Sequence, residues 1–172
     1  MGTEKGLTFA AVLKNPIYKN RNVLYELMPP GGFLHRLEQK NELIMELSPI
    51  LMDSAVSCLF VYGNPGTGKT GVILELADEL GEEAQKHGMS LKVAYVNTSE
   101  NRTETSILIE LLNKLDEENE YPRMGWTRTK AVSEFNKLLN RLKCQILIVL
   151  DEVDYVLKES GDDILYRLSR IN

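Results

Sequence analysis

Several features are scarce in this sequence, and each scarcity excludes a class of protein. No apolar run approaches the ~18–20 residues that a membrane-spanning helix needs, and the N-terminus lacks the basic-then-apolar order of a secretory signal. Repeats and low-complexity tracts are absent, and a composition with 43% apolar and 26% charged residues excludes a fibre or a disordered chain. The net charge of -5 gives no global argument for nucleic acid. We therefore expect a cytoplasmic globular protein that does not engage a membrane.

Cysteine is also scarce, with Cys58 and Cys144 as its two occurrences. Each lies in or beside an apolar run that is typical of a buried strand. We therefore expect small core residues in a reducing compartment, and neither a disulfide nor a metal pair.

Apolar periodicity divides the 172 residues into two parts. Residues 1–33 are rich in proline and glycine and are expected to form an N-terminal arm, whereas residues 34–172 are expected to form a single domain. Helical spacing is present at 34–51, from Lys69 to about Gly88, and at 107–115, 131–142 and 164–168, and buried strands are expected at 56–62, 91–96 and 145–150. This alternation predicts an α/β fold with a parallel sheet and helices on both faces.

The segment Gly63–Thr70 fits the pattern G-x-x-x-x-G-K-[ST] at every fixed position. The glycines let successive backbone N–H groups turn toward phosphates, and the following helix adds the positive end of its dipole. Lys69 supplies a cation for the β- and γ-phosphates, and the Thr70 hydroxyl is a ligand for Mg²⁺. The alternative, a glycine turn that merely joins strand to helix, is disfavoured by the flanking pattern. The predicted nucleotide site comprises Gly63, Asn64, Pro65, Gly66, Thr67, Gly68, Lys69, Thr70 and Gly71.

A second pattern is the apolar run 146–150 followed by Asp151 and Glu152. Because such a run ends at the carboxyl edge of a sheet, where ligands bind in doubly wound folds, we expect Asp151 to orient Mg²⁺ and Glu152 to polarise the attacking water. Asn97, at the end of the preceding strand, either orients Glu152 or belongs to a strand-end turn, and the turn is favoured. Arg36, at a helix start, is either solvated or close to the nucleotide.

The segment from Arg123 to Lys143 carries six basic residues against one acid. Basic charge beside Trp126 suits contact with DNA phosphates, for which Arg123, Arg128 and Lys130 are the further candidates. The alternative is the solvated face of an amphipathic helix whose apolar side chains point inward.

Five segments together resemble archaeal origin-recognition and cell-division-control-type initiators, which are AAA+ ATPases of P-loop type. They are residues 17–24, 34–39, 62–70, 150–157 and 161–172. The resemblance implies origin DNA, the replicative helicase and other initiator subunits as partners, ATP or ADP with Mg²⁺ as ligands, and a nucleoid-associated location. It also implies that a DNA-contacting element lies within about 102–129.

By the same resemblance, the chain ends where the family continues into a further strand with a sensor residue, an arginine finger, a helical lid and a winged-helix domain. The AAA+ module is then incomplete, and hydrolysis is expected to be slow, since loss of a finger arginine costs about 10³–10⁵-fold in rate in comparable systems. Two alternatives stay open: a non-enzymatic module that associates with itself or pairs with a second chain through an open sheet edge, and another AAA+ or signal-transduction ATPase.

Overall fold

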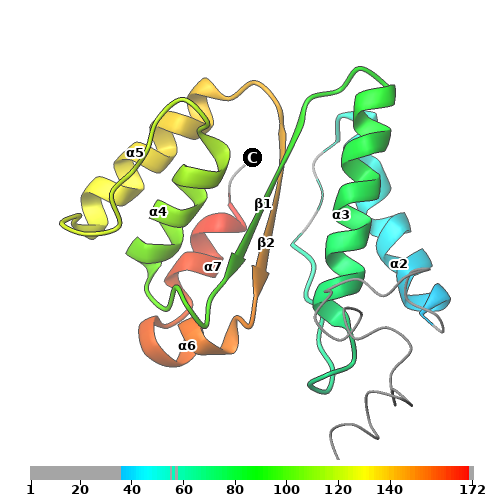
Figure 1. Ribbon diagram of the computed structural model, residues 1–172, viewed down its shortest axis with the longest axis horizontal. Coiled ribbons are helices and arrows are strands. Elements are labelled where there is room, and N and C mark those ends of the chain that lie inside the picture. The colour runs from blue at the N-terminus through cyan, green and yellow to red at the C-terminus, as the bar shows by residue number, and fades with distance from the viewer. Residues whose placement is uncertain (1–35, 55, 57, 171–172) are drawn as a thin grey trace, which may run out of the picture.

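The computed structural model describes residues 36–54, 56 and 58–170 (Figure 1). The predicted arm 1–33 therefore lies outside the described residues. In chain order the elements are α2 (Leu37–Leu47), the 3₁₀ helix η2 (Ser48–Met52), α3 (Lys69–Lys86), β1 (Leu91–Asn97), α4 (Glu104–Leu115), α5 (Arg128–Arg141), β2 (Gln145–Asp151), α6 (Asp154–Ser160) and α7 (Asp163–Leu168). The predicted helices are present, and α6 is an additional helix that was not predicted from the sequence. Within these residues, no helix combines the length and the apolarity that a bilayer crossing requires.

The predicted parallel sheet is confirmed in β1 and β2, which pair in parallel with Leu91 opposite Gln145 and Asn97 opposite Asp151. Helices α2 and α3 lie on one side of this sheet, and α4 to α7 lie on the other (Figure 1). The fold is thus α/β, with helices on both faces as expected. Because the strands run parallel, both end at the same edge, which brings Asn97 and Asp151 together near the start of α3.

The main hydrophobic core lies between the sheet and α4, α5, α6 and α7. Its largest buried side chain is Phe135 of α5, which shares this core with Ile107 of α4 and Val156 of α6. Helix α4 begins three residues before the predicted start, because Thr103 and Ser106 form a reciprocal capping box there.

The predicted strand at 56–62 is wrong for the residues that the structure describes, which are in neither helix nor strand. Phe60 is 69% exposed and Tyr62 is 83% exposed, and Cys58 is exposed instead of buried in a core. An apolar run favours burial, but a strand also needs a neighbour about 4.8 Å away to complete its hydrogen bonds. Among the described residues the sheet consists of β1 and β2, so this run has no ladder partner there.

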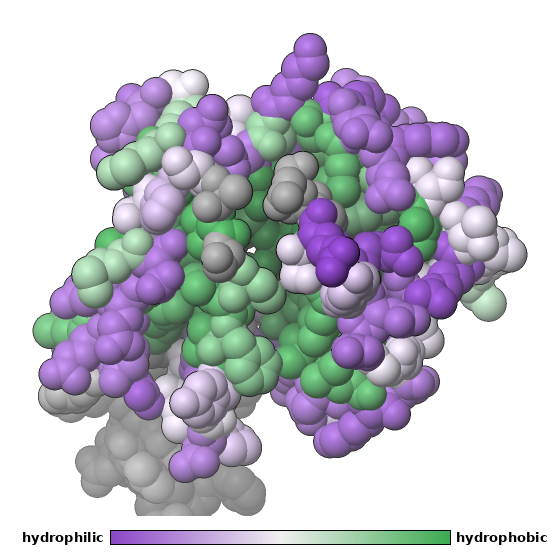
Figure 2. Space-filling view, turned by 180° about the vertical axis from the view of Figure 1, so that it is seen from behind, coloured by the Kyte–Doolittle hydropathy of each residue, from purple (hydrophilic) through white to green (hydrophobic). Residues whose placement is uncertain are grey.

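The strand predicted at 145–150 is present as β2, but its predicted burial is corrected, since all seven of its residues are half-buried. The face that carries Ile146, Ile148 and Leu150 packs against the main core. Seen from behind, hydrophobic residues line a hollow between the two halves of the molecule (Figure 2). The strand is therefore packed on its α4–α5 side and more open toward α3.

Candidate nucleotide and metal site

The loop Gly63–Thr70 has the backbone geometry that its glycines predict. Gly66 and Gly68 have φ values of 72° and 81°, a left-handed region that other residues rarely adopt. The Thr67 hydroxyl donates to the Asn64 carbonyl at 2.9 Å, which closes the turn on itself. Helix α3 begins at Lys69, within this loop, so the first N–H groups of the helix belong to the last residues of the loop.

Two cationic side chains lie against this loop. The Lys69 Nζ donates to the carbonyls of Gly63 and Asn64, both at 3.0 Å, so the ammonium group lies against the start of the loop. The Arg36 guanidinium, at the start of α2, donates to the Thr67 carbonyl at 2.9 Å. The structure thus places Arg36 on the loop, and its closeness to a bound nucleotide stays a prediction.

Thr70 and Asp151 meet across 81 residues of sequence. The Thr70 hydroxyl donates to Asp151 Oδ2 at 2.7 Å, and the Tyr95 hydroxyl donates to the same oxygen at 2.9 Å. The backbone N–H of Glu152 donates to Asp151 Oδ1 at 3.0 Å. Burial, followed by the bond to Asp151, raises the pKa of Tyr95 to about 12, so its hydroxyl remains a donor at neutral pH. Sequence reasoning missed Tyr95; the available signal was its position two residues before the end of β1, on the side of the sheet that Asn97 shares.

Glu152 directly follows β2 and has a left-handed backbone, with φ of 56°. Its carbonyl accepts the hydroxyl of the buried residue Thr98 at 2.6 Å. The Asn97 Oδ1, in contrast, accepts the N–H of Ser99 at 2.8 Å, which is the strand-end turn favoured from the sequence. A contact of Asn97 with the Glu152 side chain stays a prediction, and the observed link from β1 to Glu152 runs through Thr98.

These residues fit a nucleotide with a divalent cation. The cradle is made of glycines at positions where a Cβ would be strained, the cations Lys69 and Arg36 lie on it, and hydroxyl and carboxylate oxygens adjoin it. Mg²⁺ prefers hard oxygen ligands of this kind, and one or two carboxylates are usual in phosphate sites. Thr70 and Asp151 are therefore the residues that would hold the metal.

The predicted DNA-contacting side chains lie around α5. Arg123, in the loop before α5, forms an ion pair with Glu110 of α4 at 3.0 Å, and its side chain is 76% exposed. Lys130 lies over the Trp126 ring, 4.3 Å from its centroid, and Trp126 packs against the main core. Exposed ion pairs contribute only about 0–1 kcal/mol, so Arg123 is available to an anionic partner.

Arg128, the fourth candidate, has a structural environment. It pairs with Glu104 and, at 2.7 Å, with Asp163 of α7. Glu104 is buried at the start of α4 and also accepts Arg167 Nε at 2.7 Å. Arg128 therefore joins α5 to α4 and α7, and a contact with DNA would compete with these pairs.

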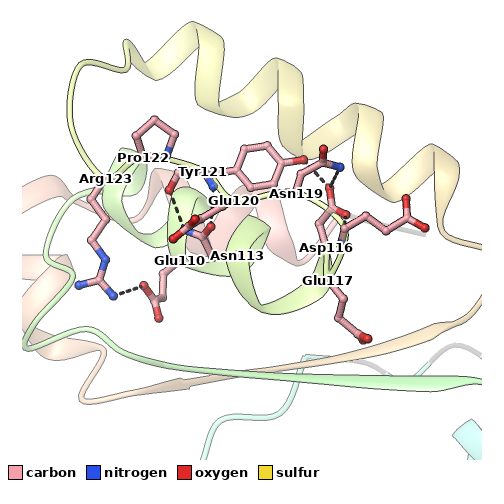
Figure 3. A pocket seen from close by; sticks show the side chains of 10 residues that line it. Glu110, Asn113, Asp116, Glu117, Asn119, Glu120, Tyr121, Pro122 and Arg123 are labelled. Carbon is pink, nitrogen blue, oxygen red and sulfur yellow. Dashed lines mark hydrogen bonds and ion pairs between the residues drawn. The ribbon is translucent and has the colours of Figure 1, made fainter.

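The surface between α4 and α5 contains an open pocket of about 780 Å³ lined by acidic side chains (Figure 3). Asp116 is buried at its edge and accepts the hydroxyl of Tyr121 and the amide of Asn119, and Arg141 approaches it to 2.6 Å. Burial alone would raise the pKa of Asp116, but these donors prevail and lower it to about 2. The pocket is thus an anionic surface whose edge is held by hydrogen bonds, on the side of the sheet opposite α3.

Comparison with known proteins gives concordant matches. A family model described as an AAA domain matches residues 52–172. An ORC1-type DNA replication protein of Thermococcus onnurineus is 39% identical over 158 residues, which are 91% of this chain and 38% of that protein. The ORC1-type DNA replication protein 1 of Archaeoglobus fulgidus is 36% identical over 156 residues, which are 91% of this chain and 37% of that protein.

A solved structure of the Aeropyrum pernix ORC1 protein in complex with DNA superposes with a TM-score of 0.76 at 32% identity. The match covers 90% of this chain and 40% of that one. The chain thus spans about two fifths of the length of these relatives, and the resemblance to archaeal origin-recognition proteins is confirmed over that part.

Proposed function

Because the chain belongs to the AAA domain family, we propose that it binds ATP or ADP with Mg²⁺ at the loop Gly63–Thr70 and hydrolyses ATP. The observation that carries this proposal is the 2.7 Å hydrogen bond from the Thr70 hydroxyl to Asp151. It brings the end of the phosphate loop and the acid at the end of β2 within reach of one bound cation.

Each side chain of the site has a defined task in this proposal. Lys69 and the N–H groups of the loop hold the phosphates, and Arg36 supports the loop from outside. Thr70 and Asp151 present oxygen atoms to Mg²⁺, which when bound neutralises charge on the phosphates. Glu152 lies next to Asp151 with its side chain exposed, so it can orient a water for attack on the γ-phosphate.

Nucleotide binding by the Lys69→Ala variant tests the proposal. Loss of a charged hydrogen-bond donor costs about 1.5–3 kcal/mol, so affinity for ATP with Mg²⁺ should fall about 10- to 100-fold. The matched control is Lys86→Ala, because Lys86 is an exposed lysine at the far end of the same helix, paired with Glu83. Calorimetry should show unchanged affinity in the control. Equal affinity in the Lys69 variant would refute the site.

Phosphate release from ATP separates an ATPase from a module that only binds. Phosphate release that disappears in Glu152→Gln supports hydrolysis at this site, since that variant keeps the backbone and removes the charge. Binding with no release, in contrast, favours a nucleotide-dependent interaction module.

We further propose that the cellular role is replication initiation, with origin DNA, the replicative helicase and other initiator subunits as partners in the nucleoid. The support is the similarity to ORC1-type proteins over 91% of the chain. The test is DNA binding across a range of salt concentrations, using Arg123→Ala with Lys137→Ala as control, because Lys137 is an exposed lysine that pairs within α5. Loss of one phosphate contact should reduce the salt slope by about 1 for Arg123→Ala only. Absence of DNA binding at low salt would favour a protein partner for this surface.

A further inference from the structure

Tyr95 lies near the carboxyl end of β1, and the alternation of the strand decides which way it points. Ala94 and Val96, its neighbours in sequence, are buried in the main core on the α4–α5 side. Tyr95 therefore projects to the opposite face, toward α3. It pairs in register with Val149, so Asp151, two residues further along β2, is its diagonal neighbour on the same face. A tyrosine is long enough to span such a diagonal.

The hydrogen bonds of Asp151 use both of its carboxylate oxygens. Oδ2 accepts the hydroxyls of Thr70 and Tyr95, and Oδ1 accepts the N–H of Glu152. Thr70 belongs to the phosphate loop and helix α3, whereas Tyr95 and Glu152 fix the carboxylate from the sheet. Once Thr70 engages a ligand, the Tyr95 hydroxyl is the side-chain donor that keeps Oδ2 in place.

We propose that Tyr95 is a positioning residue that holds Asp151 in the orientation needed to bind Mg²⁺. This inference rests on the proposed function of the site. Tyr95 acts through Asp151 and contacts neither nucleotide nor metal. Partners of this kind orient the groups that bind metals, and their removal typically weakens metal affinity or activity about 10- to 100-fold.

The experiment is a Mg²⁺ titration of ATP binding by the whole chain, with the Tyr95→Phe variant compared with the unaltered protein. The substitution keeps the ring and its packing and removes only the hydroxyl. Without Mg²⁺, the affinity of Tyr95→Phe for ATP should stay within about twofold of that of the unaltered protein. The Mg²⁺ concentration that gives half of the maximal increase in ATP affinity should rise about 10-fold. The matched control is Tyr121→Phe, which removes a hydroxyl bound to the buried carboxylate of Asp116 elsewhere in the molecule. It should leave the Mg²⁺ dependence unchanged.

A double-mutant cycle distinguishes positioning from a general loss of stability. In the Asp151→Asn background, Tyr95→Phe should change the Mg²⁺ dependence by less than twofold, because the group through which it acts has been altered. An equal effect in both backgrounds, or an unchanged Mg²⁺ dependence in Tyr95→Phe alone, would overturn the inference. If the unaltered protein binds no ATP with Mg²⁺, the proposed function fails instead.

Discussion

The left-handed backbone of Glu152 predicts a measurable strain at this position, which substitution by glycine should relieve. A left-handed conformation costs a residue with a Cβ about 1–2 kcal/mol, and Glu152 has φ of 56°. Glycine adopts this conformation freely but loses about 0.5–1 kcal/mol more chain entropy on folding. The difference predicts that Glu152→Gly is about 0.5–1 kcal/mol more stable than Glu152→Ala, since both lack the carboxylate and only alanine keeps the strain.

The assay is urea denaturation of both variants, followed by phosphate release from ATP. Both should release no phosphate above background, because each lacks the carboxylate that we propose orients the attacking water. Asp53 provides a second position for the same comparison, since its φ is 54° and it lies in an exposed turn after η2. A glycine variant at 152 that is no more stable than the alanine variant would refute the strain argument, and the result at 53 shows whether the failure is local.

Three further predictions concern the supports of the site and of the core. Thr98→Val leaves the Glu152 carbonyl without its 2.6 Å donor and should lower the unfolding free energy, measured in urea, by about 1–3 kcal/mol. Arg128→Ala should cost about 1–2 kcal/mol in the same assay, less than the 3–5 typical of a broken buried pair, because Arg167 still neutralises Glu104. The pKa of Asp116 is lowered from 3.8 to about 2 in the folded state, so its contribution is complete above about pH 4 and is lost as the pH falls toward 2. In the Asp116→Asn variant, the urea midpoint should therefore depend less on pH between about pH 4 and pH 2 than in the unaltered protein. An equal pH dependence in the two proteins would contradict this role of Asp116.

The phosphate loop could be predicted from sequence because its geometry is encoded locally. Glycine is needed where φ is positive, and Gly66 and Gly68 stand at two such positions. The helix that follows begins at Lys69, where the motif places it. Similarly, the apolar run before Asp151 predicts a strand end, and β2 ends at that residue. The local conformation of these segments and the identity of their side chains could therefore be predicted without knowledge of tertiary contacts.

Pairing and register, in contrast, depend on residues far apart in the chain. The run at 56–62 is as apolar as a buried strand, yet a ladder requires a partner, which no local pattern specifies. Tyr95 and Thr98 were missed for the same reason. Their contacts with Asp151 and Glu152 follow only from the parallel register that sets Asn97 opposite Asp151. The sequence indicates which residues of β1 share a face, but it does not indicate which residues of β2 lie opposite them.

The charge around the basic segment 123–143 could not be predicted from the sequence either, because it also depends on acids that are distant in the chain. Six basic residues against one acid between Arg123 and Lys143 favour an anionic partner when counted along the chain. In space, Glu110 approaches Arg123, and Glu104 and Asp163 flank Arg128. The local field is therefore far weaker than the count implies, because acids from α4 and α7 enter it. An anionic ligand would have to displace Glu110 from Arg123, an exposed pair worth about 0–1 kcal/mol, but could not displace the buried Glu104 without loosening α4 from α5. Of the two arginines, only Arg123 is therefore suited to report DNA contact separately from stability.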